Sequence, residues 1–190
     1  MESPDLRLGR RIAVIGGSGS GKTTLARQLA QRLGFRHIEI DSFQHGADWS
    51  QTPPAELKRL IAEQTAGDGW VCDGNYMAAL GDLVLLRAET VIWLDYPLPV
   101  ALWRLLRRTL RRISTRQELW NGNRESWRGA FIGADALFPY AVRAHLRRRQ
   151  SWPPRLAAAQ KAGVQVLHHR GPAETQRVLR PIIGGNPPRL

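Results

Sequence analysis

Apolar residues along this chain fall into two repeating patterns. Five short segments rich in apolar residues predict strands, at residues 11–15, 37–40, 69–73, 90–95 and 163–167, and the first is a short β-branched apolar run typical of a buried strand. Between them, apolar residues recur at the spacing of a helix face, which predicts helices over 22–33, 52–66, 102–113, 139–149, 151–163 and 172–179. Strands that alternate with helices predict parallel βαβ units, and therefore an α/β fold whose ligands bind where the strands end.

The segment after the fourth strand differs from the rest of the chain. Over 102–113, leucines occupy one side of the predicted helix and five arginines occupy the other. The polar stretch STRQELWNGNRES follows as a candidate lid loop, and Pro139 and Pro153 each predict the start of a further helix. We therefore expect one domain over 1–190, with a lid or insert at about 112–135 and a flexible tail at about 184–190.

A phosphate-binding motif follows the first strand. The stretch GGSGSGKTT has the P-loop spacing, and it lies between a predicted strand and a predicted helix as the motif requires. Its glycines allow backbone N–H groups to point at phosphate, Lys22 can reach the β- and γ-oxygens, and the Thr23 hydroxyl can bind Mg²⁺. The residues expected to hold ATP are Gly16, Gly17, Ser18, Gly19, Ser20, Gly21, Lys22, Thr23 and Thr24.

Sequence features outside the P-loop narrow the class of P-loop protein. The sequence contains no Asn-Lys-x-Asp guanine signature, which argues against a GTPase. A motor-type ATPase is expected to place Glu beside its strand-end Asp, but Gly74 follows Asp73 and Tyr96 follows Asp95. A chain of 190 residues is also short for a transporter ATPase. A compact kinase remains.

Aspartates end three predicted strands at the edge expected to bind ligands. Asp41 can orient or deprotonate an acceptor hydroxyl, or it can cap the segment that follows. Asp73 can hold a Mg²⁺-bound water, or it can belong to an ordinary turn; Asn75 and Tyr76 after it can bond to or stack on the acceptor. For Asp95, capping and a functional role are equally supported.

The positive charge is concentrated in one segment. The net charge is +12, and residues 104–155 hold thirteen arginines against three acidic residues. Such a segment can bind nucleic acid, surround a phosphate-transfer site, or form a solvated face in a chain that prefers Arg to Lys. Arg112, Arg116 and Arg124 flank the lid loop and are the candidates for stabilising the transferring phosphoryl group.

Five motifs occur in one order: GGSGSGKTTLARQLA, IEIDSF, WVCDGNY, TVIWLDYP and ALWRLLRRTLRR. They resemble the adenylate-kinase-related P-loop proteins labelled DNA topology modulation (FlaR-type) proteins, over about residues 11–167. The resemblance implies a fold of the nucleoside-monophosphate-kinase type, a five-stranded parallel sheet flanked by helices with an Arg-rich helical lid. It also implies that residues 16–24 carry the nucleotide. CDGNY stands where nucleoside monophosphate kinases have Asp-Gly-Phe-Pro-Arg, and this chain lacks that Pro and Arg.

The cysteine, apolar and histidine content of the chain bears on its cellular location and on possible metal binding. The single cysteine, Cys72, forms no internal disulfide, and no apolar run is long enough to span a bilayer, so we expect a cytoplasmic protein without a membrane partner. His168 and His169 point in opposite directions on an extended segment, so they do not suggest a metal site; with residues 170–171 they can line an adenine pocket.

These observations predict an ATP- and Mg²⁺-dependent kinase with a small-molecule or nucleotide acceptor. In this interpretation Lys22, Asp41, Arg112, Arg116 and Arg124 are catalytic, Asp41, Asp73, Asn75 and Tyr76 contact the acceptor, and Thr23 and Asp73 hold Mg²⁺, Asp73 through water. Two alternatives are a nucleic-acid-binding or regulatory protein that uses ATP as a switch, and a toxin-type kinase of sugar nucleotides.

Overall fold

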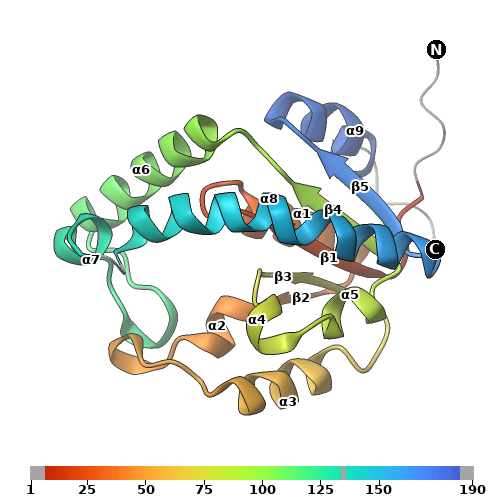
Figure 1. The fold of residues 1–190 in the computed structure, drawn as a ribbon, viewed down its shortest axis with the longest axis horizontal. Coiled ribbons are helices and arrows are strands. Elements are labelled where there is room, and N and C mark those ends of the chain that lie inside the picture. Colours follow the sequence, from red (N-terminus) through yellow and green to blue (C-terminus); the bar gives the residue numbers. More distant parts are fainter. Residues whose placement is uncertain (1–6, 134–135, 185–190) are drawn as a thin grey trace.

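A five-stranded parallel sheet forms the centre of the computed structural model, which describes residues 7–133 and 136–184 (Figure 1). The strand order is β2-β3-β1-β4-β5. The strands are β1 (Arg11–Gly16), β2 (Arg36–Glu39), β3 (Trp70–Asp73), β4 (Thr90–Leu94) and β5 (Gln165–His169). The predicted α/β fold with a parallel sheet is therefore confirmed.

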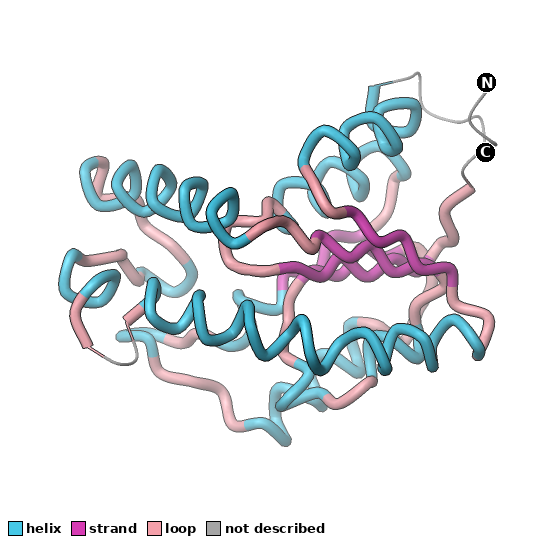
Figure 2. The backbone as a smooth tube through the Cα atoms, turned by 45° about the horizontal axis from the view of Figure 1, so that its top comes forward, coloured by secondary structure: helices cyan, strands magenta, loops and turns pink. Residues whose placement is uncertain are grey.

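Helices cover both faces of this sheet (Figures 1 and 2). The longer helices are α1 (Lys22–Leu33), α3 (Pro54–Gln64), α6 (Leu98–Ser114), α8 (Leu137–Lys161) and α9 (Pro172–Gly184). Shorter ones are α2 (Ile40–Gln44), α4 (Met77–Leu80), α5 (Leu83–Arg87) and α7 (Trp127–Phe131), and two 3₁₀ turns are η1 (Ala47–Trp49) and η2 (Trp120–Gly122). Figure 1 shows α6 and α7 extending to one side of the sheet, with α8 returning across it.

Alternate residues of each strand enter two separate cores. Ile12 and Val14 of β1 pack with α1 and α9 on one face. Ala13 and Ile15 pack on the other face with residues of α3, α4, α5 and α8. Because both faces are covered, the central strands β1 and β4 are apolar at nearly every position, which is why short apolar runs marked them in the sequence.

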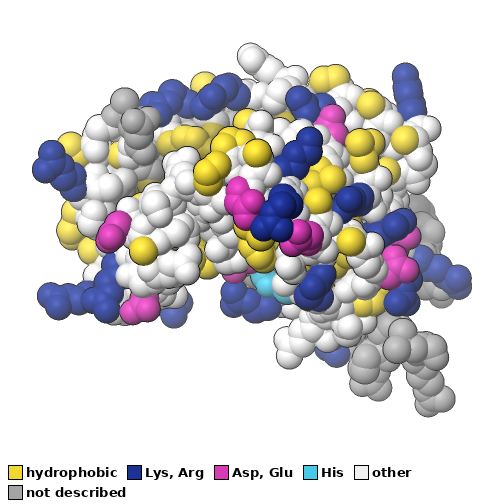
Figure 3. Space-filling model, turned by 90° about the horizontal axis from the view of Figure 1, so that it is seen from below, with side chains coloured by type: hydrophobic (Ala, Val, Ile, Leu, Met, Phe, Trp, Pro, Cys, Tyr) yellow, Lys and Arg dark blue, Asp and Glu magenta, His cyan; other side chains and the backbone are white. Residues whose placement is uncertain are grey.

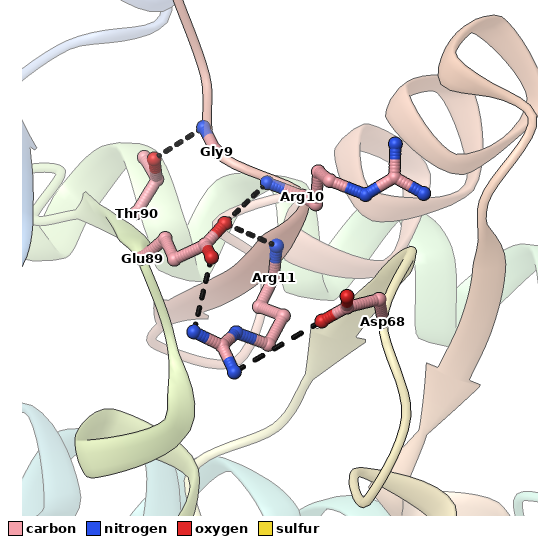
Figure 4. Close-up of polar contacts among 6 residues, drawn as sticks. All are labelled: Gly9, Arg10, Arg11, Asp68, Glu89 and Thr90. Atoms are coloured by element: carbon pink, nitrogen blue, oxygen red, sulfur yellow. Dashed lines mark hydrogen bonds and ion pairs between the residues drawn. The ribbon is translucent and has the colours of Figure 1, made fainter.

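A polar network holds the strands together at the end of the sheet opposite the P-loop (Figure 4). The Glu89 carboxylate accepts from the backbone N–H groups of Arg10 and Arg11, at 2.6 and 3.3 Å, and from the Arg11 guanidinium at 3.0 Å. The Thr90 hydroxyl accepts from the Gly9 N–H at 3.0 Å. The pKa of Glu89 is lowered: burial alone would raise it, but these donors stabilise the carboxylate more.

Three predicted boundaries differ from the structure. The second strand ends at Glu39, so Asp41 does not end a strand but lies in the first turn of α2. The fifth strand runs over 165–169 instead of 163–167, which places both histidines within it. The two helices expected around Pro139 and Pro153 are one helix, α8.

The continuity of α8 through Pro153 and Pro154 has a packing explanation. Two buried side chains on either side of these prolines, Trp152 and Leu156, pack into the same core on the sheet. Proline also has a φ close to that of a helix, and the residues whose carbonyls lose an N–H donor, Arg149 and Gln150, are exposed to water. Packing therefore outweighs the missing hydrogen bonds.

Charged side chains of both signs lie on the face of the molecule that contains α3 (Figure 3). On the face seen from below, acidic and basic side chains are mixed over the region of α3, where Arg59 pairs with Glu56 and Glu63 (Figure 3). Within residues 7–133 and 136–184, no helix is both long and apolar enough to cross a membrane. The expected tail at 184–190 lies outside the described residues, apart from Gly184 at the end of α9.

Candidate active site

The P-loop connects β1 to α1 at the carboxyl edge of the sheet. Gly19 and Gly21 have positive φ values of 81° and 89°, which side chains with a Cβ rarely adopt. No side chain of the described chain caps α1, so its first backbone N–H groups are left for an anion. The hydroxyl of the buried Ser20 also has no hydrogen-bond partner among the described residues. This geometry fits a bound polyphosphate.

The P-loop lies directly against the first turns of α6. A Cβ placed on Gly19 would come within 2.2 Å of the Ala101 carbonyl oxygen and 3.0 Å of the Leu105 nitrogen. Only glycine permits this approach. The contact fixes the start of the arginine-rich helix to the phosphate-binding loop.

Thr23 and Asp73 meet at the end of β3. The Thr23 hydroxyl donates to Asp73 Oδ2 at 2.5 Å, and His37 Nε2 lies 2.8 Å from Asp73 Oδ1. The Asp73 side chain is only 1% exposed, and a carboxylate so deeply buried needs such partners. A hydroxyl and a carboxylate next to a phosphate site are the oxygen ligands that Mg²⁺ uses with substrate phosphates.

Asn75 joins the end of β3 to the start of the P-loop. Its Oδ1 accepts from the Gly16 N–H at 3.0 Å, and its amide group donates to the Gly16 carbonyl. Both ends of the side chain are therefore used within the protein. The acceptor contact that the sequence suggested for Asn75 stays a prediction, and in the structure this side chain supports the start of the P-loop.

Four polar side chains lie together beside the ends of β2 and β3, and we call this cluster the acceptor wall: Glu39, Asp41, His45 and Tyr76. The Tyr76 hydroxyl donates to Asp41 Oδ1 at 2.6 Å and lies 3.3 Å from His45 Nε2. Asp41 caps no helix, because Glu39 holds the N-cap position of α2. The carboxylate is instead oriented by a phenol from the neighbouring strand end.

The pKa values on this wall are shifted. Burial raises the pKa of Glu39, and the nearby carboxylates of Asp73 and Asp41 raise it further. The pKa of the Tyr76 hydroxyl is also raised, first by burial and then by Asp41. Burial lowers the pKa of His45, against the opposing effect of Asp41.

The lid loop, residues 115–126, contacts the segment that follows α2. Asn123 accepts from the Trp49 N–H at 2.9 Å and donates to the Gly46 carbonyl at 2.7 Å. Asn121 donates to the His45 carbonyl at 2.5 Å, and Trp120 lies close enough to Glu39 to lower the pKa of that carboxyl against the larger effect of burial. The lid loop is therefore closed over the acceptor wall.

The three arginines proposed from the sequence lie in different surroundings. Arg112 donates to Glu125 at 2.7 Å. Arg124 is exposed and lies 3.6 Å from Glu118, and Arg116 is exposed with a positive φ of 47°. Of the three, Arg112 is the one that the structure brings to the inner side of the lid, with Glu125 only 9% exposed.

Three other arginines approach the site and were not singled out from the sequence. Arg148 Nη2 lies 3.2 Å from the position of a Cβ on Gly17, and Arg104 Nη1 lies 3.8 Å from the same position on Gly21. Arg108 lies 3.8 Å from Glu125. The spacing of 104, 108 and 112, four residues apart on one helix, was the available signal. Arg148 comes from the distant helix α8, and no local pattern indicated it.

The two histidines of β5 point to opposite sides, as expected for an extended segment. His168 stacks on Trp93 with ring centroids 4.0 Å apart and lies 3.1 Å from Asp95 Oδ2. His169 is buried, with Nδ1 3.1 Å from the Thr175 hydroxyl. Asp95 Oδ1 also lies 3.7 Å from Arg149 Nε, so this carboxylate pairs with an arginine of α8.

Comparisons with known proteins agree on the type of site. Residues 12–95 match the model of the ATPase family associated with various cellular activities (AAA). A shikimate kinase of Rippkaea orientalis is 30% identical over 132 residues, covering 63% of this chain and 71% of that protein. A cytidylate kinase of Pyrococcus furiosus is 30% identical over 112 residues, covering 51% of this chain and 56% of that protein.

The chain belongs to the P-loop kinases. A solved shikimate kinase from Acinetobacter baumannii in complex with shikimate shares the fold of this P-loop kinase, with a TM-score of 0.53 and 18% identity over 93% of this chain and 94% of the other. The expected phosphotransferase of P-loop type is thereby confirmed, as is its five-stranded sheet flanked by helices. The narrower FlaR-type assignment stays a prediction.

P-loop kinases in general use ATP with Mg²⁺, and the residues of this kinase fit both. The uncapped start of α1, the positive φ values and the unpartnered Ser20 hydroxyl suit the phosphates. Thr23 and Asp73 would hold the metal, which when bound neutralises phosphate charge.

Proposed function

We propose that this P-loop kinase transfers the γ-phosphoryl group of ATP to a hydroxyl group that Asp41 orients and deprotonates. One observation carries the proposal: Asp41 lies on the strand-end edge that holds Thr23 and Asp73, and Tyr76 bonds only one of its oxygens, Oδ1. The other oxygen, Oδ2, is the atom left for an acceptor hydroxyl.

Asp41 takes the proton of the acceptor hydroxyl as the acceptor oxygen bonds to the γ-phosphorus. The bond between the γ-phosphorus and the β,γ-bridging oxygen breaks, so that ADP leaves and the proton then passes from Asp41 to solvent. Catalysis of such a transfer comes mainly from the positioning of the reacting groups and the stabilisation of charge on the transferring phosphoryl group.

Lys22 and arginines would stabilise the charge on the transferring group. We assign the closest positions to Arg148 and Arg104, because they lie beside Gly17 and Gly21 of the P-loop. Arg112 would act from the lid, with Glu125 fixing its guanidinium. Arg116 and Arg124 are exposed, so their part in the reaction would require a movement of the lid loop.

The acceptor contacts are assigned to the same wall. Asp41 and Tyr76 would meet the acceptor, whereas Asn75 would act by supporting Gly16. Five motifs in one order also support our proposal that the chain belongs to the FlaR-type branch of these kinases. Relatives named for shikimate and cytidylate leave the acceptor open, because they differ from each other.

A coupled assay of ADP release tests the proposal. Wild-type protein with ATP and Mg²⁺ is screened against nucleosides, nucleotides and small hydroxylated metabolites, with Lys22→Ala as the inactive comparison and Lys58→Ala as the matched control on α3. We expect ADP release that depends on one acceptor class and disappears in Lys22→Ala only. ATP hydrolysis at one rate regardless of acceptor would overturn the proposal.

A further inference from the structure

We propose that Arg108 pairs with Glu125 of the lid loop before ATP binds and turns to the γ-phosphoryl group afterwards, while Glu125 keeps Arg112 in place. Glu125 would then be a positioning residue that competes with phosphate for one arginine. The inference rests on the proposed function, since it concerns the charge on the transferring group.

One carboxylate oxygen of the lid loop serves two arginines of α6. Glu125 Oε1 lies 2.7 Å from Arg112 Nη1 and 3.8 Å from Arg108 Nη2. Only the first of these contacts is a hydrogen bond. Because charge-assisted hydrogen bonds are stronger than ion pairs without one, Glu125 holds Arg112 more firmly than it holds Arg108.

Both members of the longer pair have an unused polar atom. Glu125 Oε2 and Arg108 Nε are buried and have no hydrogen-bond partner among residues 7–133 and 136–184. The Glu125 side chain is only 9% exposed, so leaving its second oxygen unpaired costs free energy. Arginine and carboxylate groups often pair through two parallel hydrogen bonds, which would use both atoms. Arg108 is therefore poorly matched to Glu125 and can take a better anion.

The place of Arg108 on α6 is between the P-loop and the acceptor wall. Arg104, one turn earlier, lies beside Gly21 of the P-loop, and Arg112, one turn later, is bonded to the lid loop. Asp41 lies close enough to raise the pKa of Arg108, against the larger lowering effects of burial and Arg112. A phosphoryl group that moves from the P-loop toward an acceptor at Asp41 would therefore pass Arg108.

Phosphate suits the guanidinium of Arg108 better than Glu125 does. A phosphate group presents several oxygens to the planar guanidinium and can accept two parallel hydrogen bonds, one of them from Nε. The exchange would thus give the unpaired Nε atom a partner. Because the bond between Arg112 and Glu125 is kept, the lid loop stays attached to α6 during the exchange.

Calorimetric titration with two nucleotides and Mg²⁺ isolates the effect of the γ-phosphoryl group. The probes are ADP and the ATP analogue in which NH replaces the β,γ-bridging oxygen, so that no transfer occurs. In Glu125→Gln the competing charge is gone, but the amide oxygen can still accept from Arg112. We expect the analogue to bind about tenfold tighter than to wild type, and ADP affinity to change by less than about twofold.

Glu118→Gln is the matched control, because Glu118 lies on the same loop but pairs with the exposed Arg124. It should change neither affinity. Equal tightening of ADP and the analogue in Glu125→Gln would show a general gain of positive potential and would overturn the inference. Unchanged or weaker binding of the analogue would also overturn it. Failure of the wild-type protein to bind the analogue would remove the proposed function instead.

Arg108→Gln identifies the arginine that changes partner. In this background Glu125→Gln should no longer tighten binding of the analogue, because the guanidinium shared by the two anions is absent. Arg107→Gln, an exposed neighbour on α6, is the control background and should keep the full gain. A gain that persists in Arg108→Gln would overturn the inference.

Glu125→Asp gives a second variant that keeps the negative charge. Its carboxylate is shorter by one methylene and would reach Arg108 less well, so the analogue should again bind tighter than to wild type while ADP affinity stays the same. Weaker or unchanged binding of the analogue by this variant would contradict the competition.

Discussion

Glu39 and Glu89 lie at opposite ends of the sheet and in opposite electrostatic surroundings. Glu39 has a raised pKa, from burial and the carboxylates of Asp73 and Asp41, whereas the donors around Glu89 give it a lowered pKa. The residue that destabilises the fold at neutral pH is therefore the one placed at the proposed acceptor site. Functional sites often contain groups that a fold alone would not favour.

The two glutamates should change stability in opposite directions. The contribution of Glu39 is full below its unfolded pKa of 4.5 and is lost as pH rises through the higher folded value, so Glu39→Gln should be more stable than wild type at pH 7. The contribution of Glu89 is present above 4.5 and is lost as pH falls through the lower folded value, so Glu89→Gln should be less stable at pH 7.

Urea unfolding at pH 7 and pH 3.5 measures both effects. Glu39→Gln should differ from wild type at pH 7 and approach it at pH 3.5, because Glu39 is then largely protonated in both states. Glu89→Gln should differ from wild type at pH 7, and the difference should shrink as pH falls below 4.5 toward the lowered folded pKa. Glu89→Gln matching wild type at pH 7 would contradict the account of the network in Figure 4.

Local sequence predicted the residues of the phosphate site better than those of the acceptor side. The P-loop spacing fixes the position of Thr23 and the strand end fixes that of Asp73, so the two were expected to lie together. The Thr23 hydroxyl is indeed 2.5 Å from Asp73 Oδ2. The partnership of Tyr76 with Asp41 could not be predicted, since it spans 35 positions and depends on how α2 follows β2. Arg148 was missed for the same reason: only the path of α8 brings it to Gly17.

Among the elements, the P-loop and α6 are joined through the backbone at Gly19. We expect Gly19→Ala to destabilise the protein by more than about 2 kcal/mol, because its Cβ would collide with the Ala101 carbonyl at 2.2 Å. Gly34→Ala is the matched control: its φ of 68° is similar, but no atom lies within 4 Å of a Cβ there.

Thermal unfolding and ATP titration distinguish these two glycine variants. Gly34→Ala should cost only about 1 kcal/mol, the conformational penalty, and should retain ATP binding. Gly19→Ala should lose both stability and ATP binding. Equal losses in the two variants would show that the contact with α6 adds nothing.

The lid loop should depend on Asn123 for its closed position. Asn123→Ala removes three side-chain hydrogen bonds, with Gly46, Trp49 and Trp120, each worth about 1 kcal/mol. We expect faster hydrogen exchange over 115–126 and a lower kcat/KM for the acceptor by about tenfold, with little change in ATP affinity. Gln117→Ala, an exposed neighbour in the same loop, is the control. Unchanged exchange in Asn123→Ala would contradict the closed arrangement.

The predicted boundaries of helices and strands were wrong where tertiary packing outweighed local sequence signals. Proline usually begins a helix, yet α8 continues through Pro153 because Trp152 and Leu156 anchor it on the sheet. The strand β5 extends to His169 because His168 stacks on Trp93 and His169 is buried near Thr175. Both contacts connect segments far apart in sequence, so periodicity could not reveal them.

For the whole molecule, the arrangement of positive charge bears on the nucleic-acid alternative. Within the described residues, at least seven of the thirteen arginines in 104–155 have an ion-pair or ring partner: Arg104, Arg108, Arg112, Arg124, Arg148, Arg149 and Arg155. Acidic side chains are also mixed with basic ones on the face in Figure 3. Much of the segment therefore serves the protein's own structure and phosphate site.

Duplex DNA should bind weakly and without regard to ATP. We expect fluorescence anisotropy to give dissociation constants no tighter than about 10⁻⁶ M at physiological salt, the range of non-specific binding, and a steep loss of binding as salt rises. Submicromolar binding that changes with ATP would favour the ATP-switched regulatory protein over the kinase described here.

The most direct test of the central claim is single-turnover phosphoryl transfer by Asp41→Asn, with the acceptor identified by the ADP-release screen. Asp82→Asn, whose carboxylate pairs with Arg155 on the surface, serves as the control. If Asp41 is the acceptor-side base, the transfer rate falls by about 10²–10⁴ while ATP affinity stays nearly unchanged. Full activity in Asp41→Asn, or loss of ATP binding and stability together, would contradict the account.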